Sequence, residues 1–150
     1  MKRISTIHKI TKISVDIFLV VGCFIIISVP YFIGQWQQFF GYSKENKYTL
    51  MAILIVSGLI ALFLLWQVRK ILKLVVEQNV FSEDTVKALR KISVGSALIA
   101  LLYVGKLFFN FNIITFLIII IFLIATLLFL TLKDVFKEAI FYKEENDWTV

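Results

Sequence analysis

The chain alternates between long apolar stretches and shorter charged ones. An α-helix needs about 20 apolar residues to cross the roughly 30 Å of hydrocarbon in a bilayer. The apolar stretches of about this length lie at 17–34, 49–68, 92–109 and 113–132. The pattern therefore predicts an all-α chain that folds as an integral membrane four-helix bundle. No linker or internal repeat divides residues 1–150, so we expect a single transmembrane domain. Its helices are expected at about 13–34, 49–77, 83–109 and 113–142.

Lysine and arginine are distributed unevenly around the apolar stretches. Thirteen of the sixteen lie in the N-terminal arm (1–16), the segment 69–91 and the tail (133–150). Because connections rich in Lys and Arg stay in the cytoplasm, both termini and the segment 69–91 are predicted to be cytoplasmic. We expect a multi-pass protein of a bacterial cell membrane. Its net charge of +6 is interpreted as contact with anionic membrane lipid and not as direct nucleic-acid binding.

The segment EQNVFSEDTVKALRKI (77–92) is charged and turn-like, although it lies between two membrane-spanning stretches. Apolar positions continue at helical spacing for about two turns beyond residue 68, which predicts a helix that leaves the membrane. Ser82 is a favourable N-cap for the next helix, and Glu83 and Asp84 lie in its first turn, near the positive end of the helix dipole. The sequence therefore predicts a cytoplasmic helical hairpin with Phe81 at its tip.

Two interpretations of this tip are open. In one, Val80 and Phe81 pack between the two arms, and the cations only mark the inner membrane boundary. In the other, the tip is a docking surface for a protein partner. The expected partner-binding residues are Asn79, Phe81, Ser82, Lys87, Arg90 and Lys91. The segment 69–91 carries a net charge of +3 and the tail one of −2, which predicts that the two pack together.

The apolar stretches contain little that could carry chemistry. Asp16 lies at the inner edge of the first stretch, where we expect it to pair with Lys12 or a hairpin cation. Lys106 lies near the outer end of the third stretch and is expected to extend to the lipid headgroups. Because His8 and Cys23 are the only residues of their types, we expect no metal site, no cofactor and no catalytic residues. The chain is predicted not to be an enzyme, and the absence of a mid-membrane acid disfavours a transporter or channel.

Small residues in the second and third stretches predict close packing between helices. These residues are Ser57, Gly58 and Ala61, and Gly95, Ser96, Ala97 and Ala100. Contact between copies in a homo-oligomer is the alternative use of such faces. Pro30, near the outer end of the first stretch, allows a kink in that helix.

The segment ILKLVVEQNVFSEDTVKALRKIS (71–93) resembles the bacterial membrane family known as domain of unknown function 2975. The central cytoplasmic loop of that family reads approximately G-N-P-F-S-x-E-N and is followed by an apolar and basic helix. The positions that fit are Asn79, Phe81 and Ser82, whereas Gln78 and Val80 replace Gly and Pro. The resemblance implies a small four-helix membrane protein. It is similar in setting to membrane proteins encoded beside a DNA-binding regulator, some of which restrain that regulator at the membrane.

We therefore expect a non-enzymatic regulatory membrane protein. Through its hairpin it would bind or restrain a cytoplasmic partner, with a DNA-binding transcription regulator as the candidate. Phe81 would supply apolar contact, and the neighbouring cations would steer an acidic surface. The alternative is an immunity protein that meets a bacteriocin or peptide toxin at the outer face, through the aromatic loop at 34–48.

Overall fold

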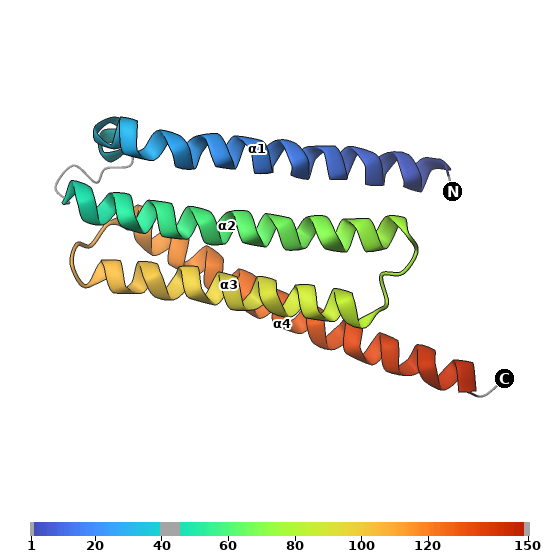
Figure 1. Ribbon diagram of the computed structural model, residues 1–150. Helices are drawn as coiled ribbons and strands as arrows, with labels where there is room; N and C mark the ends of the chain where they lie inside the picture. Colours follow the sequence, from blue (N-terminus) through green and yellow to red (C-terminus); the bar gives the residue numbers. More distant parts are fainter. Residues whose placement is uncertain (1, 40–45, 149–150) are drawn as a thin grey trace.

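The computed structural model describes residues 2–39 and 46–148, which form four helices joined by short connections (Figure 1). The helices are α1 (Lys2–Phe39), α2 (Lys47–Val76), α3 (Glu83–Leu107) and α4 (Ile113–Trp148). Each is long and apolar enough to cross a membrane. The prediction of an all-α chain with four helices capable of spanning a membrane is confirmed, and these helices indicate a multi-pass membrane protein.

Two of the helices are longer than the apolar pattern alone indicates. α1 begins at Lys2 rather than near residue 13, so the basic arm and the first apolar stretch form one helix. α4 continues to Trp148 rather than ending near residue 142. Neither extension contains a Gly or a Pro that would interrupt the backbone hydrogen bonds. Charged residues therefore continue both helices beyond their apolar parts.

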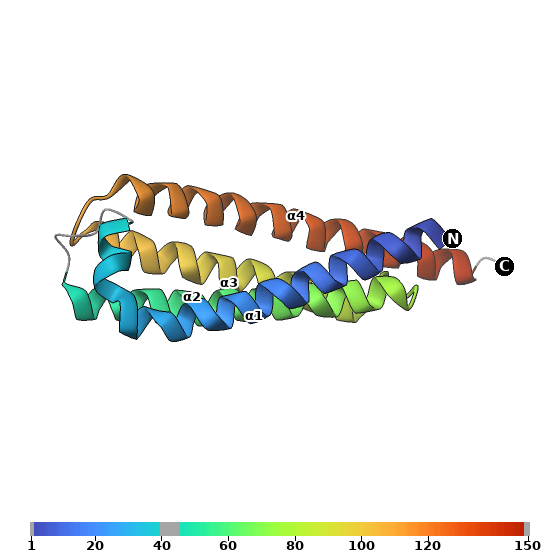
Figure 2. The ribbon, with the colours of Figure 1, turned by 90° about the horizontal axis from the view of Figure 1, so that it is seen from above.

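The helices pack in chain order as an open row. Close backbone contacts join α1 to α2, α2 to α3 and α3 to α4, and among the described residues no Cα atom of α1 lies within 8 Å of one in α4. Near the end opposite the turn, the side chain of Ile114 in α4 still packs against the cluster that Val29, Ile33 and Leu50 form between α1 and α2. Half of the most apolar window of α3 is buried, against 11% in each of the other helices, so α3 is central (Figure 2). The expected bundle is therefore not closed. Lipid tails are as apolar as Leu or Ile, so the other three helices can leave apolar faces toward them.

Two glycines allow neighbouring helices to approach closely. A Cβ atom added to Gly58 in α2 would lie 2.8 Å from Cγ1 of Ile26 in α1. One added to Gly95 in α3 would lie 2.5 Å from Cδ2 of Leu64 in α2. At these two positions the predicted small-residue faces serve contacts within the chain.

Buried polar contacts also join the helices. The hydroxyl groups of Ser57 in α2 and Tyr103 in α3 are hydrogen-bonded at 3.0 Å. Lys106 Nζ donates to Thr115 Oγ1 in α4 at 3.2 Å, and Lys106 is only 3% exposed. The expectation that Lys106 extends to the headgroups is therefore wrong. The short α3–α4 connection brings Thr115 back beside the lysine and offers it a hydroxyl acceptor.

Both termini lie at the same end of the molecule as the α2–α3 turn, which we call the turn end (Figures 1 and 2). An ion pair marks the level where the apolar stretches of α1 and α2 finish. Asp16 Oδ1 lies 2.7 Å from Arg69 Nε, although the N–H bond does not point along this line. The guanidinium group also lies over the ring of Trp66, 5.2 Å from its centroid. Asp16 thus pairs with the hairpin cation Arg69, which is one of the two pairings expected for it.

Candidate partner-binding surface at the turn end

The turn between α2 and α3 starts from a hydrogen-bonded helix end. Asn79 donates its backbone N–H to the carbonyl of Leu74 at 2.9 Å, and Gln78 donates to that of Val75 at 3.1 Å. This pair of bonds is a Schellman motif, in which the residue after the cap is left-handed and is usually glycine. Gln78 occupies that position with a φ of 58°. The family motif that this segment resembles has Gly at this position, and the reason is conformational, because Gly adopts a positive φ without strain.

Ser82 precedes α3 as predicted, but it caps the helix through its backbone alone. Its carbonyl accepts the N–H groups of Thr85 at 3.2 Å and Val86 at 3.4 Å. Its side chain makes no capping bond, and its Oγ is buried with no hydrogen-bond partner in the described structure. Ser82 is therefore half-buried and belongs more to the base of the turn than to its exposed surface.

Phe81 packs against the part of α4 that follows its apolar stretch, residues 133–148, which we call the α4 extension. Its ring centroid lies 5.4 Å from that of Phe136, with an angle of 33° between the ring planes. Phe81 nevertheless stays 47% exposed. One part of the ring is therefore packed on α4 and the rest faces outward, and the docking surface stays a prediction. The contact also joins the turn to the tail, as their opposite charges predicted.

The predicted cations form a ridge along the exposed side of α3. Lys87, Arg90 and Lys91 are exposed, because their spacing places them on one face of the helix. The opposite side of α3 is buried and includes Leu89, which is 4% exposed, and Ile92, which is 2% exposed. We call Lys87, Arg90 and Lys91 the cation ridge.

A groove lies on each side of the cation ridge. The α3–α4 groove has a volume of about 320 Å³. It is lined by Glu83, Val86, Lys87, Arg90, Lys137, Ile140, Phe141 and Glu144. On the other side lies the lysine groove, of about 280 Å³, between α2 and α3. Its lining includes Gln67, Lys70, Lys73, Glu77, Asp84, Lys87 and Lys91.

The structure thus brings three of the six predicted residues, Lys87, Arg90 and Lys91, to the two grooves. Phe81 lies in the turn, half-exposed, and lines neither groove. Asn79 is exposed in the turn but lines neither groove, and Ser82 is turned inward. The surface is predominantly positive, but Glu83 and Glu144 give the α3–α4 groove acidic positions.

Sequence reasoning missed the contributions of α2 and α4 to this surface. Lys137 and Glu144 come from the extension of α4, and Gln67 and Lys70 come from α2. The signal that could have found α4 is the helical spacing of the apolar residues Val135, Phe136, Ala139 and Ile140 in the tail, although Val135 itself is 55% exposed.

The opposite end of the molecule presents aromatic side chains. α1 is kinked at Phe32 (φ −114°, ψ 21°), two residues after Pro30, where the kink was expected. A groove of about 400 Å³ beside the kink is lined by Ser28, Phe32, Gln35, Trp36 and Phe39. Phe39 is 79% exposed, and Tyr48 on α2 is 73% exposed. The rest of the predicted 34–48 loop, residues 40–45, lies outside the described residues.

Within the described ranges, no group of three or more His, Cys, Asp or Glu residues could hold a metal ion. The single cysteine, Cys23, is a free and exposed thiol on α1. The side chains that line the two grooves at the turn end offer charged and apolar contacts.

Comparison with known proteins gives one match. A family model described as "Protein of unknown function (DUF2975)" matches residues 11–150 and so covers all four helices. No curated protein and no solved structure matches the chain. The family suggested by the motif around Phe81 is thus the family found from nearly the whole chain.

Proposed function

The chain belongs to the DUF2975 family, and on that premise we propose that it is a non-enzymatic regulatory protein of the bacterial cell membrane. It binds a cytoplasmic protein at the turn end and restrains it there. The partner is a DNA-binding transcription regulator with an acidic surface patch. The observation that carries this proposal is the cation ridge flanked by two grooves, together with the half-exposed ring of Phe81 in the turn that precedes α3.

The physical roles of the surface divide between its charges and its apolar groups. The cation ridge attracts an acidic partner and orients it, which raises the association rate more than the final affinity. Affinity comes from apolar groups that the partner covers. Phe81 is one such group, and Ile140 and Phe141 in the α3–α4 groove are others. The partner needs no contact with the membrane interior.

The proposal requires the turn end to face the cytoplasm, as the distribution of Lys and Arg indicates. Cys23→Ser removes the only cysteine, and single cysteines are then placed at Asn79 and at Lys47. Both positions are exposed and lie at opposite ends of the molecule. In intact cells, a thiol reagent that cannot cross the membrane should label the cysteine at position 47 and not that at position 79. The reverse labelling would end the proposal.

Site-specific photocrosslinking in intact cells tests the partner itself. A crosslinker at Lys87 should capture a soluble DNA-binding protein, and Arg90→Glu should reduce that adduct. Lys12→Glu is the matched control, since Lys12 is an exposed cation on α1 and undergoes the same charge change. Adducts with lipid and with other copies of this chain alone would contradict the proposal, as would equal loss in both variants.

The immunity function is a second candidate, because aromatic side chains gather at the opposite end. The groove beside Trp36 and the exposed ring of Phe39 offer apolar contact to a peptide toxin. Under this alternative, Trp36→Ala abolishes protection of the cell from the toxin, whereas Phe81→Ala with Arg90→Glu has no effect. Under the leading proposal, the two variants show the opposite pattern in the crosslinking assay.

A further inference from the structure

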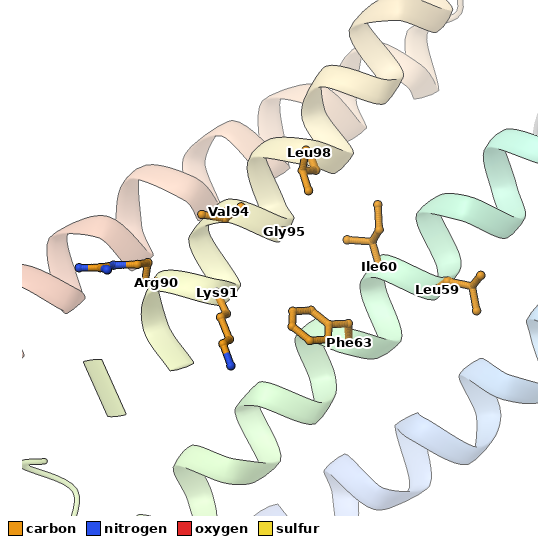
Figure 3. Close-up of a pocket in the computed structure, with 8 residues that line it drawn as sticks. All are labelled: Leu59, Ile60, Phe63, Arg90, Lys91, Val94, Gly95 and Leu98. Atoms are coloured by element: carbon orange, nitrogen blue, oxygen red, sulfur yellow. The ribbon is translucent and has the colours of Figure 1, made fainter. Parts of the chain in front are cut away.

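A second groove between α2 and α3 continues the lysine groove toward the middle of the helices. We call it the apolar groove; its volume is about 530 Å³. Its lining surface is almost entirely apolar, although Arg90 and Lys91 are among the residues that line it. Figure 3 shows Ile60 and Phe63 of α2 reaching toward α3, where Val94 and Leu98 lie beyond Gly95. Its volume lies within the range of about 300–1,000 Å³ that is typical of small-molecule sites.

Lys91 joins the two grooves. It lines both of them, and its side chain extends from α3 toward α2, whereas Arg90 leaves α3 in another direction (Figure 3). Lys91 lies opposite Gln67, two residues before Arg69 and its ion pair with Asp16. The change from apolar to cationic lining therefore coincides with the level where the apolar stretches end.

The lysine groove also contains a buried polar group without a partner. Gln67 is only 1% exposed, and its Oε1 makes no hydrogen bond in the described structure. Lys70, Lys73, Lys87 and Lys91 surround the groove, against the acidic Glu77 and Asp84. The amide of Gln67 can present either its oxygen or its N–H₂ group, depending on how it is turned. A buried amide beside an excess of ammonium groups fits an anion with several oxygens.

We propose that the joined grooves bind one anionic phospholipid from the leaflet at the turn end. One acyl chain lies in the apolar groove along Phe63 and Leu98. The phosphate lies beside Lys91 and Lys70, and Gln67 donates an N–H to it. An acidic peptide satisfies the lysines but leaves the apolar groove empty at membrane depth. Of the two ligands, only a phospholipid places a phosphate at the level where the apolar stretches end and also extends a hydrocarbon chain inward from it. The site does not depend on the partner proposed above.

Lipid retention by the purified full chain tests this site. The protein is incorporated in vesicles of equal parts phosphatidylglycerol and phosphatidylcholine, extracted in mild detergent, and analysed by native mass spectrometry. A lysine near an anionic headgroup contributes roughly a fivefold factor in binding, so two lysines give a preference of about twenty-five-fold for phosphatidylglycerol. Lys70→Gln with Lys91→Gln should remove most of that preference. Leu98→Trp, which fills the apolar groove from an exposed position, should reduce retention of both lipids.

The matched control is Lys9→Gln with Lys12→Gln, which removes the same charge from exposed positions of α1 at the turn end. It should retain phosphatidylglycerol as the unmodified chain does, and all variants should resist unfolding by dodecyl sulfate equally. Equal loss in the control would show general surface attraction and overturn the site. Unchanged retention in Leu98→Trp would place the acyl chain elsewhere and also overturn it. Displacement of the lipid by soluble glycerol phosphate would indicate an anion site alone and reject the phospholipid.

Discussion

The contact between Phe81 and Phe136 should hold the extension of α4 against the turn. Phe81 is 47% exposed, so about half of its side chain is covered. Full burial of an aromatic side chain covers about 150–250 Å², and half of that is roughly 100 Å². At about 25 cal/mol per Å², the covered area corresponds to about 2.5 kcal/mol, which is an upper value. We therefore expect Phe81→Ala to cost about 2 kcal/mol in local stability.

Hydrogen exchange at the backbone amides of 135–147 measures that local stability. A loss of about 2 kcal/mol should speed exchange there by about thirtyfold, since 1.4 kcal/mol corresponds to a factor of ten. Phe136→Ala should have a similar effect. The double variant should lose about 0.5–1.5 kcal/mol less than the sum of the single losses, because paired aromatic rings are coupled by that amount.

Phe109→Ala is the matched control, since Phe109 is 85% exposed at the far end of α3. It should leave exchange at 135–147 unchanged. Simple addition of the losses of Phe81→Ala and Phe136→Ala would show that the two rings do not stabilise each other. Full protection of the α4 extension in Phe81→Ala would show that this contact does not hold it against the turn.

Three further predictions concern helix packing, the turn and its charges. Gly95→Leu should lower stability by about 1–3 kcal/mol, because α2 leaves no room for the added side chain. A Cβ atom added at Gly105 in the same helix meets no atom within 4 Å, so Gly105→Leu should be neutral or stabilising; unfolding in dodecyl sulfate measures both variants. Gln78→Gly should stabilise the turn by about 1 kcal/mol, since Gly adopts the left-handed conformation without strain, and slower exchange at the turn amides would verify this. Glu144→Lys should weaken the packing of the α4 extension by about 0.2–1 kcal/mol, because Glu144 shares a groove with the cation ridge. The weaker packing should make the extension more sensitive to protease. Glu138→Lys, outside that groove, should have no effect, and equal sensitivity of the two variants would contradict the role of the groove.

Much of the candidate surface could be predicted from the sequence because it depends on one helix. The spacing of Lys87, Arg90 and Lys91 places them on one face of any helix that contains them, whatever packs on the other side. The partners of Phe81 and Lys106 could not be predicted in the same way. Phe81 meets Phe136, and Lys106 is buried beside Thr115, through contacts between separate helices. Neither contact leaves a periodic signal in the sequence.

The sequence alone determined the four helices and the end of the molecule that holds both termini. Backbone N–H and C=O groups must be paired within lipid, so long apolar stretches have to be helical, and an even number of crossings returns the chain to its starting side. Only the tertiary structure decided that the helices form an open row, and that an apolar groove and a lysine groove meet at Lys91. Lipid and apolar side chains are chemically alike, so hydropathy does not distinguish a face that meets lipid from one that meets a neighbouring helix. That choice depends on close packing at positions such as Gly58 and Gly95.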